Sequence, residues 1–173
     1  PVEETFTLMK QIKPDLKKVG TVWCTSETCS EACVRLARKK CAELGIELLE
    51  MSVENTTQIL EAAMSLTSRG VEALWVGGDN VVEAAIDQMI NAAAKARIPL
   101  IINNTNSVYG NTLFGLGAKY TEVGYLAGQM AADVLEGKPT SEIGIRNMVP
   151  LHLLVNPDAL NNIHDKWKLP EEL

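Results

Sequence analysis

Short apolar runs alternate along this chain with longer segments in which apolar residues recur every three or four positions. The short runs are typical of buried β-strands, and the longer periodicity is typical of helices that bury one face. The pattern predicts strands at residues 18–24, 46–53, 72–76, 98–102, 112–117 and 150–155. It predicts helices at residues 3–12, 31–44, 55–69, 81–96 and 120–135, with a short helix beginning at 156–158 and a loosely specified polar tail at 166–173.

Strands that alternate with helical segments build βαβ units, which place parallel strands in one sheet and helices on both of its faces. The predicted fold class is therefore α/β. We expect a three-layer α/β/α sandwich with a mainly parallel sheet, in a single domain that covers residues 1–173. A chain of 173 residues is long enough to bury a core of its own.

Polar loops follow three of the predicted strands, at residues 25–30, 77–80 and 103–107. Because the carboxyl ends of parallel strands lie at one edge of a sheet, these loops are expected to meet there and to border a ligand crevice. Their side chains could hydrogen-bond a polar small molecule, and the apolar Trp23 could cover its body. The candidate ligand-binding residues are Ser26, Glu27, Ser30, Asp79, Asn80, Asn104, Asn106 and Ser107.

The same loops also have a simpler interpretation. The segment 77–80, Gly-Gly-Asp-Asn, is typical of a strand-to-helix turn in which Asp79 caps the following helix. Residues 103–107 are amino acids that favour turns in any protein. The pattern of each single loop is compatible with both interpretations. The convergence of three loops on one edge of the sheet favours a binding site.

Composition and charge argue against some classes of partner. The formal net charge of −6 is unfavourable for a nucleic-acid surface, which needs clustered lysine and arginine. The one basic cluster, residues 35–40, lies on a predicted helix next to Glu43 and fits a solvated helix face. No apolar run reaches the roughly 18 residues of a membrane span, and no signal peptide is recognisable in the chain.

Four cysteines, Cys24, Cys29, Cys33 and Cys41, fall in the first quarter of the chain. Their spacing lacks the paired Cys-x2-Cys of a structural zinc site. Two cysteines one helical turn apart do not easily form a disulfide, and small buried thiols are common in protein cores. We expect buried free thiols, with one disulfide, or a metal-binding or reactive thiol, as the alternatives.

The sequence offers little support for catalysis. A nucleophile needs a neighbouring base, and the two histidines, His152 and His164, lie far downstream of the cysteines and follow no strand end on the rim. Gly115-Leu-Gly117 lacks the third glycine of a dinucleotide fingerprint, and the chain has no Gly-x4-Gly-Lys-Ser phosphate loop. We therefore expect no catalytic residue, no cofactor and no metal site.

Several motifs occur in an order that resembles a known family. They are Val-Gly-Thr-Val-Trp at 19–23, Thr-Ser-Glu-Thr-Cys-Ser at 25–30, Trp-Val-Gly-Gly-Asp-Asn at 75–80, Ile-Pro-Leu-Ile-Ile-Asn-Asn-Thr-Asn-Ser-Val at 98–108 and Gly-Leu-Gly-Ala-Lys-Tyr-Thr-Glu-Val-Gly-Tyr-Leu-Ala-Gly at 115–128. The series is similar to the ABC transporter substrate-binding protein family that includes tryptophan and tyrosine binders. Those proteins resemble type I periplasmic binding proteins, in which two α/β lobes close on a ligand. The likeness runs over nearly the whole chain but covers only the family's second half.

This resemblance implies that the chain is the C-terminal lobe of a two-lobe protein, whose first lobe has no counterpart in it. The region 118–137, with its helix at 120–135, would then pack on that first lobe or on a partner chain, for example a second copy in a homodimer. An amphipathic helix without its partner should expose Leu126, Met130 and Val134.

The resemblance also implies ligand contacts residue by residue. The chain departs from the family at Cys29, where asparagine is usual, and at Asn104 and Asn106, where aspartates are usual. An asparagine cannot neutralise the ammonium group of an amino acid as an aspartate can. Asp79 is then the residue left to face a cation, and without the opposing lobe it should be exposed to solvent. The family's contacts on this lobe match Ser26, Glu27, Ser30, Asp79 and Asn80.

The expected function is that of a solute-binding component of an ABC importer, which captures a small polar or aromatic metabolite such as an amino acid between two lobes. Such a protein would deliver its ligand to an ABC permease, and it would work in the periplasm or anchored on the outer side of a membrane. The first alternative keeps the fold but makes it the ligand-sensing domain of a signalling receptor or regulator. The second is a thiol-dependent enzyme that uses Cys24 or Cys29.

Overall fold

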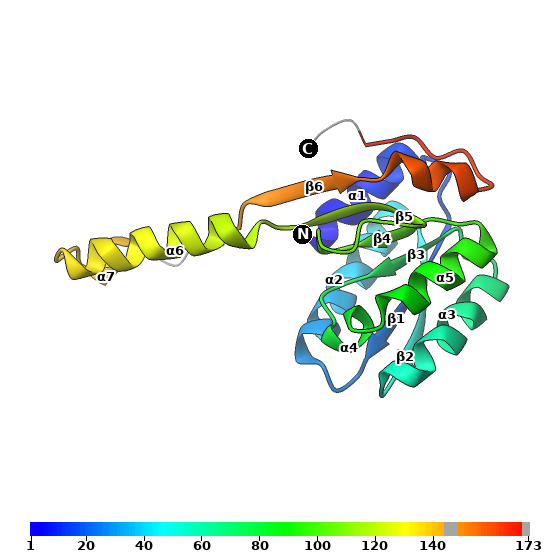
Figure 1. Ribbon diagram of the computed structural model, residues 1–173, viewed down its shortest axis with the longest axis horizontal. Helices are drawn as coiled ribbons and strands as arrows, with labels where there is room; N and C mark the ends of the chain where they lie inside the picture. The colour runs from blue at the N-terminus through cyan, green and yellow to red at the C-terminus, as the bar shows by residue number, and fades with distance from the viewer. Residues whose placement is uncertain (144–148, 171–173) are drawn as a thin grey trace.

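A six-stranded sheet in the order β2-β1-β3-β4-β5-β6 forms the centre of the molecule (Figure 1). The computed structural model describes residues 1–143 and 149–170, so the last three residues of the predicted polar tail lie outside the described part. Strands β1 to β5 are parallel to their neighbours, and β6 pairs with β5 in the antiparallel direction. The strands are β1 (Lys18–Cys24), β2 (Glu47–Val53), β3 (Ala73–Val76), β4 (Leu100–Ile102), β5 (Thr112–Ala118) and β6 (Leu151–Val155).

Helices cover both faces of this sheet, which confirms the predicted three-layer α/β/α architecture. Helices α1 (Val2–Ile12) and α2 (Thr28–Leu44) contribute to the core on one face. Helices α3 (Ile59–Ser68) and α5 (Ile86–Ala96) contribute to the core on the other face, with the single turn of α4 (Asn80–Glu83). Two 3-10 segments, η1 (Thr56–Gln58) and η2 (Pro157–Asn162), complete the body.

The central strands are apolar throughout because both of their faces are covered. In β3, Trp75 packs into the core beneath α1 and α2, whereas Leu74 and Val76 pack into the core beneath α3 and α5. Side chains of a strand alternate between the two faces of a sheet, so a strand that is covered on both sides needs an apolar residue at every position. The Phe6 ring of α1 lies 5.0 Å from the Trp75 ring and joins helix to sheet.

The helix predicted at residues 81–96 is two helices in the structure. Its first turn, α4, is capped by Asp79 and contacts β1, whereas α5 packs against α3. The chain turns between them at Ala85, whose φ of −127° and ψ of 34° are not helical. The sequence pattern missed this break because apolar residues continue at helical spacing through it.

The C-terminal segment is better anchored than the polar tail expected from its composition. The Trp167 side chain is buried in the core beneath α1, and the Lys168 amide donates to the Ile12 carbonyl (3.1 Å). The ammonium of Lys13 lies 5.8 Å from the centre of the Trp167 ring and 3.6 Å from the Asp165 carboxylate. The described part of the tail, residues 166–170, therefore closes one side of the α1 layer.

Helices α6 (Tyr120–Leu135) and α7 (Thr140–Ile143) form an arm that projects away from the body (Figure 1). Neither helix contains a buried residue, and Met130 and Val134 are 42% and 41% exposed. This confirms the expected exposure of those two side chains, while Leu126 is half-buried in a groove between α6 and α7. Within the described part of the chain, no helix is both long and apolar enough to cross a lipid bilayer.

The paired glycines of β5 allow a loop to lie directly on the strand. A Cβ atom on Gly115 would be 2.2 Å from the Asn104 carbonyl oxygen, and one on Gly117 would be 2.8 Å from the Asn104 Cα. The motif Gly115-Leu-Gly117 therefore has a packing role, because it makes room for the loop that follows β4.

We predict that Gly115→Ala lowers the free energy of unfolding of the 173-residue chain by about 2–3 kcal/mol, because the new methyl group would overlap the Asn104 carbonyl oxygen. Gly124→Ala is the matched control, because nothing lies within 4 Å of a Cβ atom at that position of α6. It should leave the stability unchanged or raise it by up to about 1 kcal/mol, since alanine is the better helix former. Urea denaturation measures both, and equal midpoints for the two variants would contradict the packing role.

Candidate functional site

The polar loops predicted to meet do lie at one edge of the sheet, at its topological switch point. The strand order β2-β1-β3-β4-β5 places β1 beside β3. The chain leaves β1 toward α2 on one face and leaves β3 toward α4 and α5 on the other. In open α/β sheets, this divergence opens a crevice at the carboxyl ends of the two strands, and ligands bind there.

Asp79 joins the elements that border this crevice. Its Oδ1 accepts hydrogen bonds from the amides of Val81 and Val82 (3.0 Å each), which caps α4. Its Oδ2 accepts from the Cys24 amide at the end of β1 and from the Ser30 hydroxyl in the first turn of α2 (2.7 Å each). One carboxylate thereby fixes the end of β1 and the first turns of α2 and α4 relative to one another.

The expectation that Asp79 is exposed to solvent is wrong. The side chain is only 3% exposed, and four donors of the chain occupy its two oxygens. Ser30 is buried as well, with its hydroxyl directed at Asp79. Burial of a carboxylate requires such partners, because an unpaired buried charge is costly. These two candidate residues therefore position the rim loops in this structure.

The glycines of the loop after β3 serve close packing against α2. A Cβ atom on Gly77 would be 3.0 Å from the Cys33 Cβ and 3.0 Å from the Trp75 ring. A Cβ atom on Gly78 would be 3.3 Å from the Cys29 sulfur. The lack of side chains lets the loop press against the start of α2, which brings the two sides of the switch point together.

Glu27 and Asn80 form a hydrogen bond across the switch point, from the loop after β1 to the start of α4. The Asn80 amide nitrogen donates to the Glu27 carboxylate (3.2 Å), and Asn80 is exposed while Glu27 is half-buried. Ser26 is exposed beside them, and its hydroxyl lies 3.1 Å from the Cys24 sulfur. These three side chains are accessible polar groups at the rim.

The loop after β4 supplies the third side of the rim. The Asn104 Oδ1 accepts hydrogen bonds from the amides of Asn106 (3.0 Å) and Ser107 (3.3 Å), which closes the loop on itself. Asn103 is directed into the protein, where its Oδ1 accepts from the Trp75 indole nitrogen (2.7 Å). The turn interpretation therefore holds for Asn104, whose side chain closes the loop, and the exposed Asn106 is the more accessible of the two side chains.

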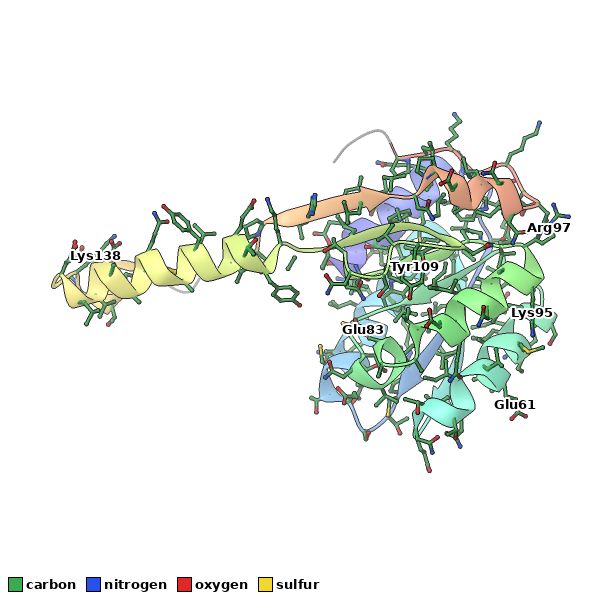
Figure 2. All side chains as sticks on the ribbon, viewed as in Figure 1. Glu61, Glu83, Lys95, Arg97, Tyr109 and Lys138 are labelled. Carbon is green, nitrogen blue, oxygen red and sulfur yellow. The ribbon has the colours of Figure 1, made fainter. Side chains whose placement is uncertain are left out.

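Glu83 is a rim residue that the sequence patterns did not single out. It lies on α4, and Figure 2 places it on the side of the body from which the arm leaves. Burial raises the pKa of its carboxyl, the Asn104 side chain lowers it by hydrogen bonding, and the negative charge of Asp79 raises it. Glu83 lies three residues after Asn80, so on a helix that begins at Asn80 the two side chains are neighbours. This spacing is the sequence signal that could have identified Glu83.

The four cysteines are free, as expected, but they are not all buried. Cys24 and Cys41 are buried, Cys33 is half-buried, and Cys29 is exposed. Burial raises the pKa of the Cys41 thiol to about 12. Burial and the neighbouring Cys33 raise the pKa of Cys29. Because the thiolate is the reactive form, these shifts reduce the reactivity of both thiols near neutral pH.

Trp23 does not cover the rim as the sequence suggested. Its indole nitrogen donates to the Glu50 carboxylate of β2 (3.1 Å), and the Arg38 guanidinium lies 5.9 Å from its ring centre. Arg38 also donates two 2.7 Å hydrogen bonds to Glu50. The aromatic ring is thus held over the face of the sheet beneath α2, where the alternation of β1 directs it.

The arm begins and ends at the same edge of the sheet as the rim. In the last paired positions of β5 and β6, Ala118 lies opposite Leu151, so the chain leaves for α6 and returns from the arm at this edge. Across residues 1–143 and 149–170, no group of three or more histidine, cysteine, aspartate or glutamate side chains is placed to hold a metal ion.

Comparison with known proteins relates the whole chain to one group. A family model described as ABC transporter substrate binding protein matches residues 1–171. A tyrosine-binding protein from Clostridioides difficile (strain R20291) is 28% identical over 168 residues, which are 97% of this chain and 48% of that protein. The chain therefore spans about half the length of this curated relative.

Solved structures show the same relation. A conserved domain protein from Vibrio cholerae superposes with a TM-score of 0.84 at 26% identity, over 99% of this chain and 57% of that one. The ligand-free, open form of a substrate-binding protein with adhesive properties from Clostridium difficile gives a TM-score of 0.78 at 25% identity, over 93% of this chain and 54% of that one. Fold, motif order and family model agree, and this chain belongs to the ABC transporter substrate-binding protein family.

Proposed function

We propose that this chain is one lobe of a solute-binding protein that captures a small metabolite for an ABC importer. The observation that carries the proposal is the rim at the β1/β3 switch point, where loops from three strands present polar side chains. Membership of the substrate-binding family supports it. Delivery to an ABC permease and a location in the periplasm, or anchored outside a membrane, belong to the same proposal.

The complete binding site needs a second surface opposite this rim. The chain spans about half of its relatives, and its exposed arm leaves and returns at the rim edge. In our proposal the region 118–137 packs on a first lobe in the full-length protein, and the two lobes close on the ligand by a hinge motion. The groove of the arm would contact that lobe. It is lined by the apolar residues Val123, Leu126, Ala127, Met130 and Ile143 and by the charged residues Asp133, Lys138 and Glu142.

The ligand that suits this rim is a small polar or aromatic metabolite such as an amino acid. A tyrosine-binding protein among the relatives supports this class. The accessible rim residues Ser26, Glu27, Asn80, Asn104 and Asn106 would contact the ligand directly. Asp79 and Ser30, also candidate contacts, would act mainly by holding the loops in place, because their polar atoms bond each other.

We predict that at least one amino acid or related metabolite stabilises the full-length protein against heat. A ligand at a hundred times its dissociation constant adds about 2.7 kcal/mol of stability. Differential scanning fluorimetry against a panel of amino acids measures the shift in Tm. A folded full-length protein that no member of the panel stabilises would count against the proposed function.

Asn80→Ala should lower the affinity for the ligand found in that screen by roughly tenfold, because a hydrogen bond at the rim is lost and Glu27 loses its partner. Asn91→Ala is the matched control, since Asn91 is exposed on α5, away from the strand ends. Titration calorimetry gives both dissociation constants. Equal affinities of the two variants for the ligand would show that Asn80 does not contribute to binding.

Met130→Glu should lower the stability of the full-length protein by about 2 kcal/mol, because it places a charge in the proposed contact between the arm and the first lobe. Ala132→Glu is the control: two residues further along α6, it lies on the opposite face of the helix. Urea denaturation measures both variants.

Sedimentation of the wild-type protein and of Met130→Glu identifies what covers the arm. A monomeric full-length protein that Met130→Glu destabilises supports packing on the first lobe. A homodimer through helix 120–135, which Met130→Glu dissociates, would replace that packing with a second copy of the chain. Equal stabilities of Met130→Glu and Ala132→Glu in a monomer would contradict both arrangements.

A further inference from the structure

The side chain of Asn103 is satisfied at both ends by groups of matching polarity. Its Oδ1 accepts a hydrogen bond from the Trp75 indole nitrogen (2.7 Å). Its Nδ2 donates to the Thr5 hydroxyl oxygen (2.8 Å) and to the Leu116 carbonyl (3.0 Å), and it lies 3.3 Å from the Pro1 carbonyl oxygen. A reversed amide would place its oxygen against these oxygens and its hydrogens against an N–H group. The surroundings therefore suit an asparagine amide in one orientation only.

The partners of this amide belong to three elements that are far apart in the sequence. Thr5 lies on α1, Trp75 on β3 and Leu116 on β5, at 98, 28 and 13 positions from Asn103. Thr5 is buried, and its hydroxyl donates to the Pro1 carbonyl (2.8 Å), so its oxygen is left to accept from Asn103. One side chain directly after β4 thus joins a helix to the two strands that flank β4.

This residue also lies where two rim loops begin. Its backbone amide donates to the Val76 carbonyl at the end of β3 (3.0 Å), and the next residue is Asn104, which closes the loop after β4. The Trp75 ring that Asn103 holds supports the loop after β3, because a Cβ atom on Gly77 would be 3.0 Å from that ring. The positions of both loops therefore depend on the contacts of one side chain.

We infer that Asn103 is a positioning residue for ligand binding, which fixes the rim loops after β3 and β4 relative to β5, the strand that leads into the arm. The inference rests on the proposed binding function. Asn103 is directed into the protein, and it acts through exposed rim residues, Asn80 after β3 and Asn106 after β4. Loops whose spacing is fixed before binding lose little freedom when a ligand joins them. Ligand affinity should therefore depend on the two donors of the Asn103 amide.

Asn111 offers a matched comparison for this role. It is a buried amide that directly precedes β5, so it lies at the end of that strand opposite to the rim. Its Nδ2 donates to the Ile98 carbonyl (3.0 Å), and its Oδ1 accepts from the Asn162 side chain (3.0 Å). A change from asparagine to aspartate at either position keeps the shape and the acceptor but removes the donor to a backbone carbonyl. The two changes should both lower stability, and only one of them should disturb the rim.

Titration calorimetry on the full-length protein tests the inference with L-tyrosine, L-tryptophan and L-leucine as probes, at about pH 8, well above the ordinary aspartate pKa of about 3.9. Asn103→Asp should lower the affinity for the probe that wild type binds by roughly tenfold or more, because the rim loops lose their fixed spacing. Asn111→Asp should stay within about twofold of wild type, since distant sites act independently. Urea denaturation should give a lower midpoint for both variants, so a difference in affinity between them cannot come from stability alone.

A second pair of variants tests the same contact from α1 and decides the matter if Asn103→Asp does not fold. Thr5→Val keeps the shape of the side chain but removes the hydroxyl that accepts from Asn103, while the Leu116 carbonyl remains as an acceptor. It should lower the affinity by roughly threefold. Thr5→Ser keeps the hydroxyl and should bind the probe more tightly than Thr5→Val.

The outcomes separate the assignment from the proposed function. Wild-type affinity in Asn103→Asp, an equal loss in Asn103→Asp and Asn111→Asp, or equal affinities of Thr5→Val and Thr5→Ser would each overturn the positioning role and leave the proposed function intact. Failure of the folded wild-type protein to bind any of the three probes would instead count against the proposed function and the assignment together.

Discussion

The buried carboxylate of Asp79 is the interaction on which the arrangement of the site depends. It joins the end of β1 to the first turns of α2 and α4, which lie on opposite faces of the sheet. A carboxylate is well suited to this place because it accepts several hydrogen bonds at once and stabilises the positive end of a helix. This contact holds the loops at the switch point in place before any ligand arrives.

Small residues make the remaining rim contacts possible. Gly77 and Gly78 let the loop after β3 press against α2, and Gly115 and Gly117 let the loop after β4 lie on β5. The loops are consequently held by backbone packing, and Ser26, Asn80 and Asn106 remain exposed at this edge. A rim built in this way can hold several polar groups in place without large rearrangement, which would reduce the entropic cost of binding a ligand.

The body and the arm differ in how much of their apolar surface is buried. The body buries two apolar cores against its sheet, whereas α6 and α7 bury no residue. An apolar stripe on a helix gains free energy only when another surface covers it. The arm and the rim lie at the same edge of the sheet, so a single opposing surface would cover both.

The sequence by itself determined the layers, the strands and the edge where the loops meet, because hydrophobic periodicity reports burial and parallel strands place their carboxyl ends together. The boundaries of β1 and α6 follow from that pattern. Only the tertiary structure decided which polar residues remain available. Asp79 and Ser30 became buried partners, Trp23 turned to the face of the sheet, and Glu83 came to the rim. Such outcomes depend on contacts between residues far apart in the chain, such as the 55 positions that separate Cys24 from Asp79, and no local pattern encodes them.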